Sequence, residues 1–196
     1  RMKRLGLRVL VIPSASLGDL FSSIRFLARV VGRQEAGEKL LQRIRAQINQ
    51  VKTTIAGTQP RRVLMVVGLH PLVAVGKGTF IDEILTLAGG ENIAGAAPPA
   101  WPHLPIEYVI AKAPQVIIEG GTGSERGELG KHWADLKSIP AVKEGRIYSY
   151  FSDKILRPGP RVGEALKEIA HLIHPECFSQ SRGKQSKKGR CEGSNP

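Results

Sequence analysis

One stretch of the sequence, from Arg61 to Asn92, constrains the fold more than any other. It opens with a continuous apolar run, Val63 to Val67, which is typical of a strand buried on both faces of a parallel sheet. An uncharged, apolar loop follows within residues 69–76. Thr79 can then cap a helix, and Asp82 stands at the right spacing to complete a capping box. We therefore predict a strand, a loop and a helix of an α/β protein.

The apolar loop after this strand is the first candidate for a ligand-binding surface. Ligands of open parallel sheets bind at the carboxyl ends of the strands, and the loop begins at such an end. The alternative, that the loop folds back onto the core, fits the spacing equally well.

The rest of the chain repeats the alternation of strand and helix. We expect further strands at residues 6–13, 115–119 and 146–151, and helices at 16–32, 33–55, 105–111, 131–137 and 162–173. The helix at 33–55 has one apolar stripe and a charged outer face, and would be roughly 35 Å long. The sequence thus predicts an α/β fold, a Rossmann-like parallel sheet lobe, with one long helix that braces it.

The net charge of +12 is concentrated at the two ends of the chain. Residues 179–196 carry five basic residues against one acidic residue and no apolar periodicity, so we expect a disordered basic tail. No aromatic residues are interleaved with the basic ones, which argues against a nucleic-acid partner. A basic interaction module that works through this tail is the alternative.

Two glycine-rich segments resemble phosphate-binding loops but lack essential residues. In Gly76-Lys77-Gly78-Thr79, the lysine is followed by glycine instead of the hydroxyl residue that a P-loop needs. Gly121-Thr122-Gly123 follows a strand, but Arg126 replaces the third glycine of a dinucleotide site. A nucleotide-dependent α/β enzyme therefore remains an alternative with weak support.

The histidines and cysteines do not form a diagnostic metal or catalytic set. His171, His174 and Cys177 have ligand-like spacing, but solvated histidines at a helix end are the favoured interpretation. His70, His103 and His132 lie in or near loops and could converge on a metal, although no acidic partner is suitably spaced. No nucleophile motif is present, so we expect a protein that is not an enzyme and holds no cofactor.

Several segments together resemble one family. They are VIPSASLGDLFSSIRFLARVVGR, TFIDEILTLAGGENIA, WPHLPIEYVIAKAPQVII, IPAVKEGRIY and SDKILRPGPRVGEALKEIAHLIHPE. The chain resembles the carboxyl-terminal part of a cobalamin-type substrate-binding protein of an ABC importer, in which one rigid helix joins two α/β lobes. AGGENIA is shared with siderophore and haem binders, whereas RPGPR and the terminal HPE point to the cobalamin-type branch.

The resemblance implies a division of the chain. Residues 1–32 would be the end of the amino-terminal lobe, 33–57 the backbone helix, 58–178 the carboxyl-terminal ligand-binding lobe and 179–196 the tail. The amino-terminal lobe would be largely missing, as if the chain were cut from a longer protein. We therefore expect this chain alone to bind ligand weakly or not at all.

The resemblance also implies a function and a set of site residues. The protein would capture cobalamin, a corrinoid, and deliver it to the permease subunits of an ABC importer; haem or an iron-siderophore is the alternative cargo. The protein would be periplasmic or otherwise extracytoplasmic, with or without a membrane anchor, and its signal segment would lie outside this chain. Glu107 would dock on the permease, and the ligand would meet His70, Pro71, Leu72, Val73, Trp101, Pro102, Asp153, Lys154, Leu156 and Arg157.

Overall fold

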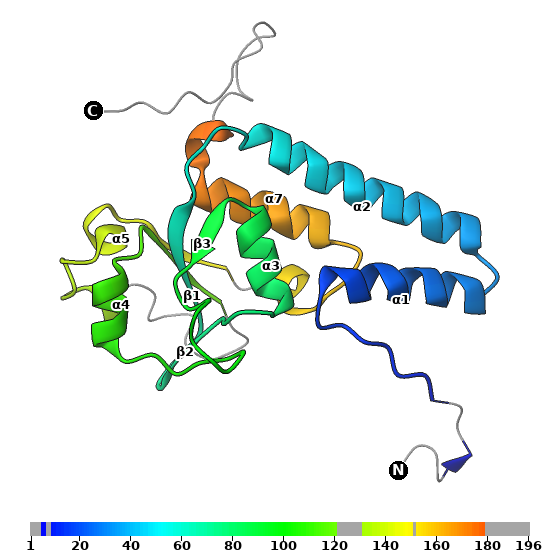
Figure 1. The fold of residues 1–196 in the computed structure, drawn as a ribbon, viewed down its shortest axis with the longest axis horizontal. Coiled ribbons are helices and arrows are strands. Elements are labelled where there is room, and N and C mark those ends of the chain that lie inside the picture. The colour runs from blue at the N-terminus through cyan, green and yellow to red at the C-terminus, as the bar shows by residue number, and fades with distance from the viewer. Residues whose placement is uncertain (1–4, 7–8, 121–130, 151, 179–196) are drawn as a thin grey trace, which may run out of the picture.

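The computed structural model describes residues 5–6, 9–120, 131–150 and 152–178. One sheet is covered by helices on both faces, and two long helices extend to one side (Figure 1). In chain order the elements are α1 (Leu17–Val30), α2 (Gln34–Thr54), β1 (Arg61–Leu69), β2 (Leu72–Ala74), α3 (Phe80–Leu87), β3 (Gly90–Asn92), α4 (Ile106–Lys112), β4 (Val116–Glu119), the 3₁₀ helix η3 (Lys131–Trp133), α5 (Pro140–Lys143), β5 (Ile147–Ser149), α6 (Asp153–Leu156), α7 (Val162–Ile173) and the 3₁₀ helix η4 (Pro175–Cys177).

The sheet is built around β1, as its apolar run predicted. β1 pairs in parallel with β4 on one side, and β4 pairs in parallel with β5. On its other side, the first half of β1 pairs in parallel with β3, and its second half pairs antiparallel with β2. The predicted α/β fold with a parallel sheet is therefore confirmed. The short strands β2 and β3 were not predicted, because three residues carry too little periodicity to be recognised.

Alternate side chains of β1 and β4 enter two separate cores. Val63, Met65 and Ile118 pack with α2, α3 and α7 on one face of the sheet. Leu64 and Ile117 pack with α4, α5 and η3 on the other. This two-sided burial explains why these strands are apolar throughout instead of alternating with polar residues.

The helices begin where the capping residues indicated. The Ser16 hydroxyl accepts the amide of Asp19 at the start of α1, and the Thr79 hydroxyl accepts the amide of Asp82 at the start of α3. Helix α2 confirms the long helix predicted at 33–55, and its stripe at Ile44 is fully buried. Helix α2 packs on α7 and α1, so the predicted brace also contributes to the core.

Two elements expected from the sequence are wrong in type or length. Residues 9–13 form no strand, and Val11 is 86% exposed. No strand in the described part of the chain pairs with this segment, and an unpaired strand has no ladder to stabilise it. The helix expected at 131–137 is only the 3₁₀ turn η3, because Trp133 is buried against the sheet and the chain turns there. The predicted glycine-rich loop and disordered tail lie outside the described residues.

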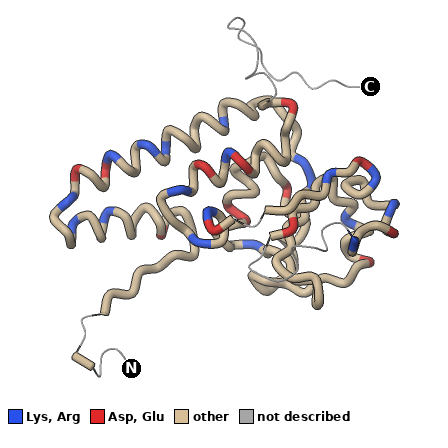
Figure 2. Tube along the Cα trace, turned by 180° about the vertical axis from the view of Figure 1, so that it is seen from behind, with Lys and Arg blue, Asp and Glu red and all other residues tan. Residues whose placement is uncertain are grey.

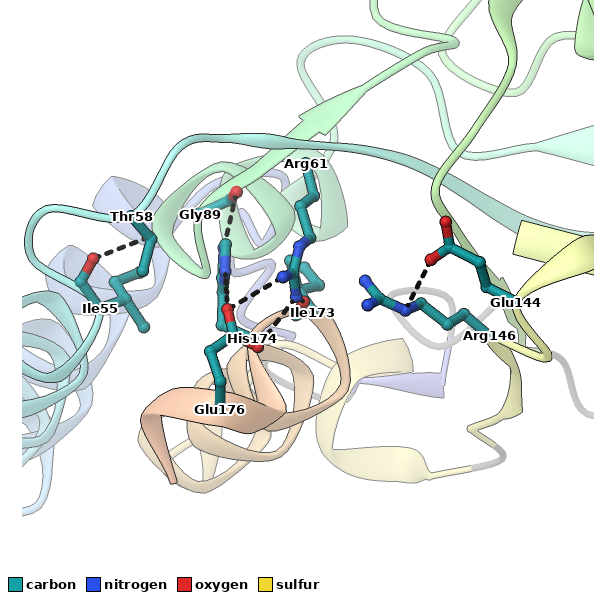
Figure 3. Close-up of polar contacts among 9 residues, drawn as sticks. All are labelled: Ile55, Thr58, Arg61, Gly89, Glu144, Arg146, Ile173, His174 and Glu176. Atoms are coloured by element: carbon teal, nitrogen blue, oxygen red, sulfur yellow. Dashed lines mark hydrogen bonds and ion pairs between the residues drawn. The ribbon is translucent and has the colours of Figure 1, made fainter. Parts of the chain in front are cut away.

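A polar cluster ties the end of α7 to the start of the sheet (Figure 3). The Arg61 guanidinium donates to the Ile173 carbonyl and pairs with Glu176 at 3.0 Å. The expectation of a solvated His174 is wrong: its side chain is buried to 1% exposure, and Nε2 lies 3.1 Å from the Gly89 carbonyl. Partial burial opposes ionisation of Glu176, but hydrogen bonds and Arg61 hold its pKa below the usual value. The HPE motif thus fixes the end of α7 to the beginning of β1. The ligand loops described below lie at the opposite, carboxyl end of the strands.

Candidate ligand-binding site

The three predicted ligand loops follow strands that end at one edge of the sheet. The loops follow β1, β3 and β5, which all run in the same direction as β4, so their carboxyl ends point to this edge. The register continues past the strands, because the Gly120 amide donates to Val66 and the Tyr150 amide to Glu119, each at 2.8 Å. In Figure 1 the β1–β2 turn and the loop leading to α4 both lie on the lower side of the sheet. We refer to this edge as the rim.

Two of the predicted segments are joined directly by backbone hydrogen bonds. The Ala74 amide donates to the Pro102 carbonyl at 2.9 Å, and the Leu104 amide donates to the Leu72 carbonyl at 3.0 Å. Residue 103 forms an antiparallel bridge with Val73. The loop at 100–104 therefore runs beside β2 and extends the hairpin into one continuous surface.

Gly76 permits this close approach. Its amide donates to the Ala100 carbonyl at 2.8 Å, and a Cβ at this position would lie 2.7 Å from the Pro99 carbonyl oxygen. Only a residue without a side chain fits between the two segments without moving the backbone.

The apolar loop after β1 divides between surface and core. His70 and Pro71 are exposed at the turn, and Val73 is half-buried. Leu72 and Pro102 are buried and support the surface from below. Trp101 stays 45% exposed, which is unusual for so large an apolar side chain. The alternative in which the loop folds back onto the core is confirmed for its buried residues, and ligand contact by its exposed residues stays a prediction.

The third segment is helix α6, and its side chains face several ways. The Ser152 hydroxyl caps the helix, and Leu156 is partly buried against the core. Asp153 and Arg157 are exposed and form a loose pair at 3.9 Å. Both can offer charge at the rim.

Lys154 is held by acidic side chains of α7. Its ammonium lies 2.6 Å from Glu168 and 3.2 Å from Glu164. The hydrogen bond from Lys154 to Glu168 chiefly raises the pKa of the ammonium. Lys154 therefore connects α6 to α7 through its ion pairs with these two glutamates.

Tyr150 completes this network by donating its hydroxyl proton to Glu168. Burial, followed by the neighbouring carboxylate, raises the pKa of the Tyr150 phenol. Partial burial opposes ionisation of Glu168, but its hydrogen bonds with Lys154 and Tyr150 outweigh this and lower its pKa. The end of β5, α6 and α7 are thereby linked by charge-assisted hydrogen bonds.

Two ring contacts at the rim connect His70, His132 and Trp133. The His70 ring lies 5.4 Å from the His132 ring, which in turn lies 5.1 Å from Trp133. The Trp133 indole donates to the buried carboxylate of Glu119 at 2.6 Å. The sequence analysis left open that these two histidines could converge, but it could not establish their contact, because they lie on opposite sides of β4 in the sequence.

The alternative sites found in the sequence look less suited to ligands. The Gly78 amide donates to the Asp82 carboxylate at 3.0 Å, so an acidic group occupies the place where a phosphate would bind. Gly121 to Gly123 lie outside the described residues. Between residues 5 and 178, as far as the structure describes them, no three potential metal ligands form a group.

A cavity of about 970 Å³ lies between α2, α7 and the end of β5. Gln50, Tyr150 and His171 are among its lining residues, and none of the predicted ligand residues is. It exists only because α2 packs on α7, which spacing along the sequence does not reveal.

Basic and acidic residues are interspersed along the described part of the chain. Lysine and arginine are spread over α1, α2 and the helices around the sheet, with aspartate and glutamate among them (Figure 2). Within the described residues, no helix is long and apolar enough to cross a membrane.

Comparison with known proteins shows the family. Residues 3–153 match the model described as "Periplasmic binding protein". The vitamin B12-binding protein of Salmonella paratyphi A (strain ATCC 9150 / SARB42) is 28% identical over 173 residues, which cover 88% of this chain and 63% of that protein. The chain thus spans less than two thirds of this curated relative.

Solved structures agree on the fold. The periplasmic vitamin B12 binding protein BtuF of Vibrio cholerae superposes with a TM-score of 0.74 at 23% identity, covering 91% of this chain and 69% of that one. The periplasmic heme-binding protein RhuT from Roseiflexus sp. RS-1 gives 0.79 at 26% identity, covering 90% and 70%. The chain therefore belongs to the periplasmic binding protein family, as its resemblance to cobalamin-type members predicted.

Proposed function

We propose that this chain is the carboxyl-terminal lobe and backbone helix of a binding protein that captures a cobalamin-type corrinoid and delivers it to an ABC importer. The observation that carries this proposal is the rim, where exposed Trp101 stands on a loop hydrogen-bonded to the β1–β2 hairpin. A macrocycle needs a broad apolar wall with a few polar groups, and Asp153 and Arg157 supply polar groups from α6. The similarity to a vitamin B12-binding protein supports the corrinoid as cargo.

Haem is the second candidate cargo. RhuT, a heme-binding protein, has an identity and coverage close to those of the B12-binding relative. An exposed histidine at the rim also suits a ligand that carries iron.

Transport, not catalysis, is the proposed role, and delivery needs a docking surface. Glu107 is exposed in the first turn of α4, where a carboxylate is free to meet a basic partner. We assign it to contact with the permease, outside the cytoplasm. Its position at a helix amino terminus also stabilises α4, so the two roles are compatible.

Calorimetric titration of the 196-residue chain with cyanocobalamin tests the cargo. We expect saturable binding at micromolar or weaker affinity, and Trp101→Ala should weaken it at least fivefold because the apolar wall is lost. Phe26→Ala is the matched control, since Phe26 is 44% exposed but lies on α1. Equal affinities for all three proteins would contradict the proposal. Hemin in parallel titrations separates the two cargos.

A further inference from the structure

The cavity between α2 and α7 has no part in the proposed capture of a cargo. It measures about 970 Å³, and its lining includes none of the residues predicted to bind the corrinoid. Figure 1 shows α2 and α7 side by side, and the two helices pack on each other. Small-molecule sites in proteins typically measure about 300–1,000 Å³. The cavity is therefore large enough to hold an organic ligand of its own.

Apolar side chains form one part of the cavity lining. Val51 of α2 is buried, whereas Leu172 and Phe178 are partly buried against the core. The Phe178 ring makes an edge-to-face contact with the His171 ring, with their centroids 5.4 Å apart. A hydrocarbon group that lies against this surface is removed from water, which favours its binding.

The acidic side chains of the lining already have partners. Glu168 accepts the hydroxyl proton of Tyr150 and pairs with the Lys154 ammonium at 2.6 Å. Glu164 pairs with the same ammonium at 3.2 Å. A cationic ligand would have to compete with Lys154 for both carboxylates, so the network disfavours a positively charged ligand.

The polar groups that remain in the lining are hydrogen-bond donors. Lys167 and His171 stand four residues apart on α7, which places them on the same face of the helix. Within the described residues, Lys167 forms no ion pair, and the side-chain amides of Gln47 and Gln50 form no hydrogen bond. An ammonium and two amides are suited to the oxygens of a carboxylate.

We propose that this cavity binds an organic carboxylate with a hydrocarbon body, such as a fatty acid. The carboxylate pairs with Lys167 and accepts hydrogen bonds from Gln47 and Gln50, and the hydrocarbon lies against Val51 and Leu172. The ligand contacts α2 and α7 at once, so it strengthens the packing of the long helix on the lobe. This second site does not depend on the corrinoid proposed as cargo.

Calorimetric titration of the 196-residue chain with sodium dodecanoate, below its micellar concentration, tests the site. We expect saturable binding, and Lys167→Met should weaken it at least fivefold, because methionine keeps an apolar stem but carries no charge. Lys143→Met is the matched control, since Lys143 is exposed on α5, outside the cavity, and its loss should leave the affinity unchanged. Equal affinities of the wild type and Lys167→Met, or no saturable binding to the wild type, would overturn the proposal.

Two further titrations separate this site from unspecific binding of an amphiphile to exposed apolar side chains. Dodecyltrimethylammonium has the same chain with the opposite charge, and should bind at least tenfold more weakly than dodecanoate. Gln50→Trp adds a large ring to the lining at an exposed position and should also weaken dodecanoate binding at least tenfold, with the fold checked by circular dichroism. Equal binding of the two amphiphiles, or a folded Gln50→Trp variant with wild-type affinity, would count against the site.

Cyanocobalamin distinguishes failure of this inference from failure of the proposed function. Lys167→Met should bind cyanocobalamin as the wild type does, because Lys167 is not among the residues assigned to the cargo. A fall in its affinity for both ligands would place them in one site and overturn the inference. Dodecanoate binding that depends on Lys167 in a protein that binds no cyanocobalamin would support the second site and remove only the corrinoid.

Discussion

Lys154 shows how tertiary contacts redirect a residue that the sequence places in a ligand loop. Its neighbours in the sequence suggest a charge facing the cargo, but its ammonium lies between Glu164 and Glu168. The aliphatic part of the Lys154 side chain is long enough to reach from α6 to α7. Asp153 and Arg157 of the same segment remain exposed at the rim. Its assignment to the ligand-binding set stays a prediction, with positioning of α6 as its structural role.

The network around Glu168 has a predictable pH dependence. The folded-state pKa of Glu168 is lowered, so its contribution to stability is complete above the unfolded-state value of about 4.3 and is lost as the pH falls through the folded-state value. Between pH 5 and 3, Glu168→Gln should therefore lose less of its unfolding free energy than the wild type. The difference should be at most about 1 kcal/mol, because the side chain is 42% exposed and solvent screens it.

Urea unfolding measured at several pH values checks this expectation. Glu35→Gln is the control, because Glu35 pairs with Lys39 on the outer face of α2 and is 83% exposed. We expect its acid profile to parallel that of the wild type. Parallel profiles for Glu168→Gln as well would show that the network does not stabilise the folded state.

The close packing of α1 on α2 depends on one glycine. A Cβ added at Gly37 would lie 2.5 Å from the Cβ of Ala28, which has no rotamer to escape through. Gly37→Ala gains helix propensity but should destabilise the protein overall by about 1–3 kcal/mol, because the helices must move apart. Thermal or urea unfolding measures the change.

Gly18 provides the comparison for Gly37 within the same pair of helices. A Cβ at Gly18 would meet only the Ser16 hydroxyl oxygen, at an ordinary 3.6 Å. Gly18→Ala should thus be neutral or stabilising by at most about 1 kcal/mol. Equal stability changes for the two variants would show that the α1–α2 spacing is not limited by side-chain size.

These elements also show what local sequence can and cannot predict. Thr79 and Asp82 predicted the start of α3, because a capping box lies within four residues of the chain. The run at Val9 to Val11 predicted a strand wrongly, because a strand also needs a neighbour, and the described chain offers none. The same limit applies to the site: the order of the loops followed from parallel strands, but the contact of His70 with His132 did not.

The shape of the whole molecule bears on how well it can hold a cargo. The rim presents one surface, and a cleft that encloses most of a ligand requires a second surface opposite it. Apolar side chains are exposed beside the sheet lobe, on α1 and the segment before it, at Leu10, Val11, Phe26, Val30 and Val31. Exposed apolar residues gathered on one part of a molecule are typical of an interface. The B12-binding relative has over a third of its length outside the match, enough for a further lobe.

A cargo held between two surfaces should bind far more tightly than one held by the rim alone. The 196-residue chain should bind cyanocobalamin with a dissociation constant above 1 µM, and sub-micromolar affinity in a calorimetric titration would contradict this. Fusing the amino-terminal part of the Salmonella relative ahead of Val9 should tighten binding at least a hundredfold, about 2.7 kcal/mol, because the cargo is then enclosed from two sides. The same fusion carrying Trp101→Ala is the control: it should keep the fold by circular dichroism but lose much of the gain. If the fusion folds and binds no better than the single lobe, the cargo does not bind between two surfaces, and the rim is not half of a cleft.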